Sequence, residues 1–172
     1  MATLQRHAPV DIGRWAKQGA VGGVIAGIVF AMFEMIMAAV LNGAAAFFMP
    51  LRMIGAIVLG MKALDPGYSL LTAGVVGLML HMMLSIVFGI IFAALVASIP
   101  GLANSSPILL VAASVYGFAL WIVNFYVIAH AASWSWFPDK TNVAVQFVAH
   151  TIMFGTVLGI FLDRTHARDA TT

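Results

Sequence analysis

Four long apolar runs constrain the fold of this chain more than any other feature of its sequence. They cover about residues 18–42, 70–98, 107–131 and 141–162, and only the first contains an Asp, Glu, Lys or Arg residue. Each run reaches the roughly 20 residues that a helix needs to cross about 30 Å of hydrocarbon. We therefore expect an all-α, polytopic membrane protein, a four-transmembrane-helix bundle that forms one integral membrane domain over residues 1–172.

The composition excludes a soluble protein. Only 8% of the residues are charged and 63% are apolar, whereas a soluble domain carries about 25% charged residues. The lipid bilayer is therefore the expected partner of most of the surface. A net charge of +2 gives no reason to expect a nucleic-acid partner. The absence of Cys excludes thiol chemistry and cysteine-based metal sites.

A short apolar segment lies between the first two runs. It predicts an interfacial helix over about residues 50–64, because the segment is too short to cross the bilayer. Arg52 and Lys62 near its ends could extend to the lipid head groups. The alternative is a re-entrant hairpin, which Gly55 and Gly60 would permit, although non-helical backbone must be shielded from lipid.

The distribution of Lys and Arg predicts the orientation of the bundle. Five of these residues precede the first run or follow the fourth: Arg6, Arg14, Lys17, Arg164 and Arg168. Three lie on the opposite side: Arg52, Lys62 and Lys140. Since cytoplasmic segments carry the excess of positive charge, we expect both termini to be cytoplasmic, in a bacterial inner (plasma) membrane. Trp134, Trp136 and Phe137 would then form an aromatic anchor at the outer face.

Glu34 is the only Glu in the chain, and it lies inside the first run. An acidic side chain at the centre of a membrane helix costs roughly 2.5–3.5 kcal/mol, so its surroundings must compensate. Small residues recur at every fourth position before it: Gly19, Gly23, Gly27 and Ala31. Such a ridge lets another helix approach closely, and at about 100° per residue Glu34 points within about 20° of it. We expect the carboxyl group to face the bundle interior.

Polar residues on the second and third runs follow a similar pattern, whereas on the fourth run the small residues are displaced by about 100° from His150. On the second run, His81 shares a helical face with Gly74 and Ser85. On the third run, Asn124 lies on the face of Gly117. Each of these runs therefore presents a polar group beside a small residue, as expected for helix contacts in a membrane.

The depths of the polar residues agree with one another. Counted at about 1.5 Å per residue from the cytoplasmic ends, Glu34 lies at about 24 Å and His81 at about 27 Å. On the same scale Asn124 lies at about 26 Å and His150 at about 18 Å. His130, at about 34 Å, belongs to the outer rim. The sequence predicts one polar layer in the outer half of the membrane.

A cation site made by Glu34, His81 and His150 is the functional interpretation of this layer. A carboxylate and two imidazoles suit a divalent transition metal, two His on facing helices can ligate a haem iron, and the same groups can carry a proton. The supporting polar residues would be Asn124, Gln146, Ser85 and His130. The alternative is an interhelical polar cluster with no ligand, in which each hydrogen bond contributes about 0.6 kcal/mol.

Two classes of function remain open on these observations. One is a small integral membrane protein that binds or conducts a cation, either a proton, a transition metal or a haem iron, at the polar layer. The other is a non-catalytic accessory or assembly subunit in a homo-oligomer or a larger membrane complex, because the small-residue ridges could also contact a partner. The eleven Met could suggest copper ligands, but Met is common filler in apolar bundles. An enzyme that uses only these residues is a less expected third class, because no sequence motif indicates one and the sequence reveals no access for a lipid or quinone substrate.

Two stretches resemble patterns in small, uncharacterised four-helix bacterial inner-membrane proteins. They are residues 81–89, with the sequence HMMLSIVFG, and residues 116–126, with the sequence YGFALWIVNFY. The resemblance covers half of the chain and implies the four-helix membrane fold. It brings no established activity, cofactor or site residue with it.

Overall fold

The computed structural model describes residues 12–99 and 101–169, with side chains through residue 166. Within these ranges it contains no strand, and four of its helical spans are long and apolar enough to cross a membrane. The expectation of an all-α bundle with four spans is therefore confirmed. Arg6 and the side chain of Arg168, two of the five cations expected on the cytoplasmic side, lie outside the described residues.

Two spans are unbroken helices and two contain π-helical segments. The unbroken ones are α1 (Ile12–Asn42) and α3 (Leu70–Ser98). The third span joins α4 (Ser106–Ile122), the π-helical η4 (Val123–Ile128) and α5 (Ala129–Ala131). The fourth joins α6 (Val143–Val148), the π-helical η5 (Ala149–Thr156) and α7 (Val157–Asp169). Shorter elements connect them: α2 (Met49–Leu59) and the 3-10 turns η1 (Ala44–Ala46), η2 (Met61–Leu64) and η3 (Leu102–Asn104).

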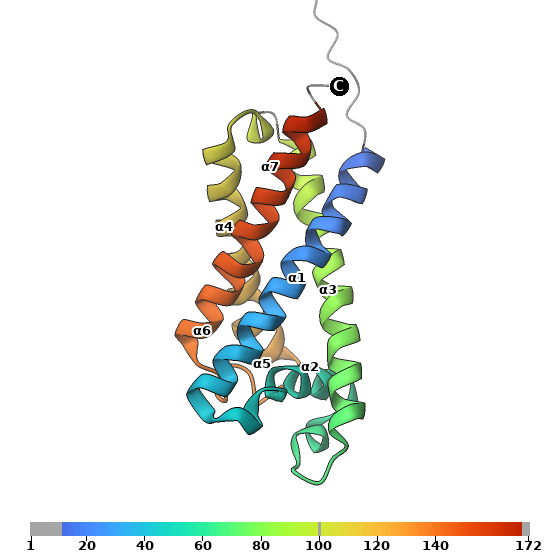
Figure 1. The fold of residues 1–172 in the computed structure, drawn as a ribbon, viewed down its shortest axis with the longest axis vertical. Coiled ribbons are helices and arrows are strands. Elements are labelled where there is room, and N and C mark those ends of the chain that lie inside the picture. Colours follow the sequence, from blue (N-terminus) through green and yellow to red (C-terminus); the bar gives the residue numbers. More distant parts are fainter. Residues whose placement is uncertain (1–11, 100, 170–172) are drawn as a thin grey trace, which may run out of the picture.

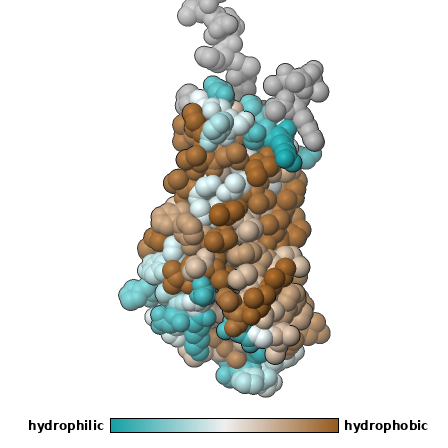
Figure 2. Space-filling view, turned by 60° about the vertical axis from the view of Figure 1, so that its left-hand side comes forward, coloured by the Kyte–Doolittle hydropathy of each residue, from teal (hydrophilic) through white to brown (hydrophobic). Residues whose placement is uncertain are grey.

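The surface of the bundle is that of a membrane protein. Figure 2 shows an apolar band over the middle of the visible face, with hydrophilic residues gathered toward its two ends. Large apolar side chains such as Met79, Leu71 and Val111 are exposed on the outside of the spans. Lipid is the solvent that makes such exposure favourable. The identity of the membrane and the side on which the termini lie stay predictions.

The small-residue ridge of α1 packs against α3. A Cβ atom placed on Gly23 would collide with the Ser85 carbonyl oxygen, and one on Gly89 would collide with the Gly19 carbonyl oxygen. Because these glycines have no side chain, the two backbones approach closely, as small residues permit in membrane helices. This contact places Glu34 on a helix face that is held against the rest of the bundle.

The third and fourth spans meet through a second set of small residues. A Cβ atom on Gly117 would collide with the His150 carbonyl oxygen, and one on Gly155 would collide with the Ala113 carbonyl oxygen. Ser114 and Thr156 add a hydrogen bond of 2.8 Å between their hydroxyl groups across the same interface. The backbone of the fourth span at His150 is therefore fixed against α4.

Apolar side chains fill the half of the bundle where α1 begins and α7 ends, at the top of Figure 1. Leu109, Leu158 and Leu162 are fully buried there, and Phe92 and Val96 of α3 are almost so. The Tyr116 ring packs against the same cluster, and its hydroxyl donates a hydrogen bond of 2.9 Å to the Phe88 carbonyl oxygen. Packed side chains therefore close this half of the bundle.

The segment between α1 and α3 forms the helix α2, which crosses the opposite end of the bundle (Figure 1). Its contact with α3 is made at Gly55 and Gly77, since a Cβ on either glycine would collide with a carbonyl oxygen of the other helix. Pro50 lies in its first turn and Gly60 ends it with a positive φ of 80°, where glycine is favoured. Its location in the membrane interface stays a prediction.

Two residues near α2 have partners that the sequence did not suggest. Trp136 was expected to anchor the outer membrane face, but it is only 4% exposed, and its Nε1 donates a hydrogen bond of 3.0 Å to the Met53 carbonyl oxygen. The guanidinium of Arg52, which was expected to extend to head groups, donates to the carbonyl oxygens of Ala63 and Asp65. The expectation for Trp136 was wrong, because a main-chain carbonyl of α2 accepts its indole N–H and the ring is buried. Contact of Arg52 with head groups stays a prediction. The two side chains instead hold α2 and the loops beside it together.

Candidate functional site

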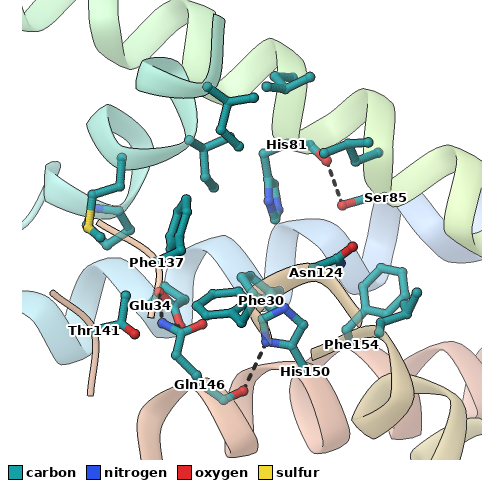
Figure 3. A pocket seen from close by; sticks show the side chains of 18 of the residues that line it. Phe30, Glu34, His81, Ser85, Asn124, Phe137, Thr141, Gln146, His150 and Phe154 are labelled. Atoms are coloured by element: carbon teal, nitrogen blue, oxygen red, sulfur yellow. Dashed lines mark hydrogen bonds between the residues drawn. The ribbon is translucent and has the colours of Figure 1, made fainter. Parts of the chain in front are cut away.

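A cavity of about 460 Å³ opens inside the bundle on the side of α2, and we call it the chamber (Figure 3). Its polar lining residues are Glu34, His81, Ser85, Asn124, Thr141, Gln146 and His150. Its aromatic lining residues are Phe30, Phe88, Phe125, Trp134, Phe137 and Phe154. Aliphatic side chains of α2, α3 and the third span complete the wall.

The structure brings six of the seven predicted site residues to this one chamber. They are Glu34, His81, Ser85, Asn124, Gln146 and His150. His130 is not among the residues that line it, and it is exposed on α5. The helical-depth argument placed His130 at the rim, beyond the polar layer.

Glu34 and Gln146 form the central polar contact of the chamber. The Gln146 side-chain amide donates to both carboxyl oxygens of Glu34, at 2.8 Å to Oε1 and 3.0 Å to Oε2. Glu34 is 8% exposed and Gln146 is 5% exposed. Among the described residues, no Lys or Arg lines the chamber. The carboxyl group is thus held in place by a neutral donor and has no positively charged side chain beside it there.

The geometry fixes which nitrogen of His81 carries the proton when the ring is neutral. His81 Nε2 lies 2.9 Å from the Gly27 carbonyl oxygen on α1. A carbonyl oxygen can only accept, so Nε2 must be the donor. Nδ1 of the neutral ring then keeps a free lone pair. Ser85 donates its own hydroxyl to the His81 carbonyl oxygen, at 2.8 Å, within α3.

The protonated nitrogen of His150 is assigned in the same way, but here it is Nδ1 that faces a carbonyl oxygen. Nδ1 lies 3.0 Å from the Gln146 carbonyl oxygen one turn earlier, so Nδ1 donates and Nε2 of the neutral ring keeps the lone pair. The Phe30 ring contacts both imidazoles, with centroid distances of 5.2 Å to His81 and 4.8 Å to His150. Phe125 contacts His150 from another side, at 5.2 Å. Aromatic rings therefore hold both imidazoles in position.

This arrangement does not assemble a metal ligand set. Within the described ranges, no three His, Cys, Asp or Glu side chains lie close enough together to hold a metal ion. Phe30 occupies space against both imidazole rings, whereas bis-His ligation of a haem iron needs both rings to face the metal. What the chamber offers is a carboxyl group and two neutral nitrogen acceptors on separate parts of its wall.

Both π-helical segments lie at the chamber. Asn124 belongs to η4 and His150 belongs to η5. A π-helical turn alters the side-chain register of a helix, and such turns are frequent at functional sites. The Asn124 side chain lines the chamber and makes no hydrogen bond to any described residue. Its amide is available to a ligand.

A second cavity, of about 370 Å³, lies on the other side of the Glu34 carboxyl group, and we call it the vestibule. Its distinctive residues are Met37, Leu41, Asn42, Lys140 and Asn142. Asn42, Lys140 and Asn142 are exposed. Glu34 and Gln146 line both cavities. The Glu34–Gln146 pair therefore forms part of the partition between the vestibule and the chamber.

Sequence reasoning missed two features of the site. Gly74, grouped above with His81, has open space around its Cα, whereas Gly77 is buried against α2. The signal was present, because Gly77, His81, Ser85 and Gly89 recur at every fourth position. The second feature is Phe30, one turn before Glu34, whose contact with both imidazoles has no signature that distinguishes it from an ordinary core aromatic.

Comparison of the chain with protein-family models, with curated proteins and with solved structures finds no match. The interpretation of the site therefore depends on its own geometry.

Proposed function

We propose that this protein binds a proton, or another small cation that can take its place, at Glu34 and moves it across the membrane as a carrier rather than an open pore. One observation carries the proposal above all others. The only carboxyl group of the chamber lines both the chamber and the vestibule and has no basic side chain beside it in the chamber. An ionisable residue at membrane depth is expensive, and those that persist mark ion and proton pathways.

The polar lining of the chamber favours a positively charged ligand. Gln146 uses its amide to hold Glu34, and each neutral imidazole uses its N–H group on a main-chain carbonyl. Among the titratable groups of the chamber, those left free to a ligand are the carboxylate oxygens and the unprotonated nitrogens of His81 and His150, and all of these are acceptors, whereas the neutral Asn124 amide offers both a donor and an acceptor. Acceptors attract a proton or a cation and repel an anion.

The closed half of the bundle supports a carrier rather than a pore. The vestibule gives Glu34 a route to the end of the bundle that carries α2 and Lys140. On the opposite side, the fully buried side chains of Leu109, Leu158 and Leu162 fill the space between the helices. Passage to that side requires the helices to move. With the termini on the cytoplasmic side, as the charge distribution predicts, Glu34 would be loaded from outside the cell.

Proton flux into liposomes tests the proposal. The purified protein is reconstituted with a pH-sensitive dye inside, and a potassium diffusion potential drives proton entry. Wild-type protein should acidify the interior faster than protein-free liposomes do. E34Q should lose this difference, because Gln keeps the shape and most of the hydrogen bonding but cannot carry the proton.

Asp139 provides the matched control. It is exposed in the loop before α6 and lines neither cavity, so D139N removes a carboxyl group without touching the site. This variant should retain the wild-type rate. A wild-type rate equal to that of protein-free liposomes, or an E34Q rate equal to that of the wild type, would overturn the proposal.

A further inference from the structure

We infer that the chamber also accepts a lipophilic aromatic cation with a single positive charge, which takes the place of the proton at Glu34. This inference rests on the proposed function of Glu34 and names the class of ligand that the rest of the chamber fits. It follows from the size of the chamber, the chemistry of its wall and its charge.

The chamber is far larger than a proton or a bare metal ion requires. A cavity admits one water molecule at roughly 10–15 Å³ on a comparable measure, and the chamber measures about 460 Å³. Cavities that bind organic molecules of drug size run from about 300 to 1,000 Å³. The space therefore matches an organic molecule rather than an isolated ion.

The wall of the chamber suits an aromatic cation in particular. Six aromatic side chains line it: Phe30, Phe88, Phe125, Trp134, Phe137 and Phe154. Ring faces attract a cation electrostatically, and the attraction is strongest where water is excluded. Ring edges and faces also pack favourably against the rings of a ligand. Aliphatic side chains such as Leu80, Leu84 and Leu120 add apolar surface to the wall, which disfavours a strongly hydrated inorganic ion.

The charge of the lining sets the ligand charge at one. Glu34 is the only acid among the residues that line the chamber, and the basic Lys140 lines only the vestibule. The other titratable groups that face the space are His81 and His150, whose neutral rings present acceptors. One carboxylate neutralises one positive charge, whereas a dication would leave a buried charge without a partner. An acyl chain of lipid could fill the apolar space, but it carries no positive charge to pair with the carboxylate.

At Glu34, one proton is exchanged for one ligand cation, so the charge of the site is conserved. When the carboxyl group starts protonated, entry of one monocation breaks the O–H bond, the proton leaves through the vestibule, and the carboxylate remains as the counterion of the ligand. No other bond changes and no oxidant or reductant is required.

Isothermal calorimetry with tetraphenylphosphonium tests the inference on the full chain in detergent, with protein-free micelles as the baseline. The neutral probe is triphenylphosphine oxide, which keeps three of the four phenyl rings and carries no net charge. Tetraphenylphosphonium should bind wild-type protein and D139N equally. It should bind E34Q at least about tenfold more weakly, since the buried cation loses its carboxylate counterion. Triphenylphosphine oxide should bind wild-type protein at least about tenfold more weakly than the cation.

The two proposals fail in different ways. If proton flux requires Glu34 but tetraphenylphosphonium does not bind, the inference is wrong and the proposed function stands. If both probes bind alike, the chamber is only an apolar cavity that a lipid chain could fill, and the inference is overturned. The comparison of the two probes needs no variant, so it remains decisive even if E34Q does not fold.

Discussion

Replacing Gly77 with Ala tests whether α2 is held on α3 at the chamber. A Cβ atom at this position would lie 2.8 Å from the carbonyl carbon of Leu51, and still closer to the carbonyl oxygen. Ordinary contact begins at 3.4 Å, so α2 would have to move away by at least the difference of 0.6 Å. The obstacle is backbone rather than the end of a flexible side chain, so a rotamer change cannot relieve it.

The magnitude follows from two opposing terms. Overpacking a tight contact costs about 1–3 kcal/mol, and a rigid backbone neighbour places this case in the upper part of that range. Ala is a better helix former than Gly by up to about 1 kcal/mol, which offsets part of the cost. We expect G77A to lower the free energy of unfolding by about 1–2 kcal/mol. For a chain of this size that corresponds to a fall in Tm of roughly 2–8 °C.

Gly74, less than one turn away on the same helix, is the matched control. Nothing lies within 4 Å of a Cβ atom placed there, so G74A should leave Tm unchanged or raise it slightly. The assay is thermal unfolding in mild detergent followed by tryptophan fluorescence, because Trp136 contacts α2 directly. Tetraphenylphosphonium binding should also weaken in G77A alone, since Pro50, Met53 and Ile54 of α2 line the chamber. Equal Tm values for the two variants would refute the packing argument.

Three further predictions address packing and orientation. W136F should lower the free energy of unfolding by about 1–3 kcal/mol in the same detergent assay, because a main-chain carbonyl of α2 loses its buried donor; an unchanged Tm would contradict this. In a double-mutant cycle of S114A and T156V, the coupling free energy should be about 0.6 kcal/mol, the usual value for a hydrogen bond between membrane helices. If the two changes in unfolding free energy were strictly additive, the hydrogen bond would contribute nothing. The chain contains no Cys, so a single introduced Cys reports which side of the membrane its loop lies on. In whole cells, S135C should react with an impermeant maleimide, whereas N104C should react only after permeabilisation. The reverse pattern would show that the predicted orientation is inverted.

The sequence by itself determined the membrane class, the four spans and the helix faces that turn inward. These properties depend on local regularities, namely the length of the apolar runs and the four-residue recurrence of small and polar residues. Glu34, His81 and His150 could be assigned to one layer for the same reason, because helix rise and rotation are nearly constant along a span. The assignment was least accurate on α3, where Gly74 was taken for Gly77.

Only the tertiary structure decided how those faces are paired. The hydrogen bonds between Glu34 and Gln146 join residues that are 112 positions apart, and the rotation and register that bring them together arise from glycine contacts between whole helices. The same long-range packing placed Phe30 against both imidazoles and used Trp136 to hold α2 rather than to anchor the membrane face. The π-helical turns at Asn124 and His150 were equally invisible. A helical pattern predicts which side of a helix is polar, but the partner that meets it is set by the neighbouring helices, whose positions no local pattern encodes.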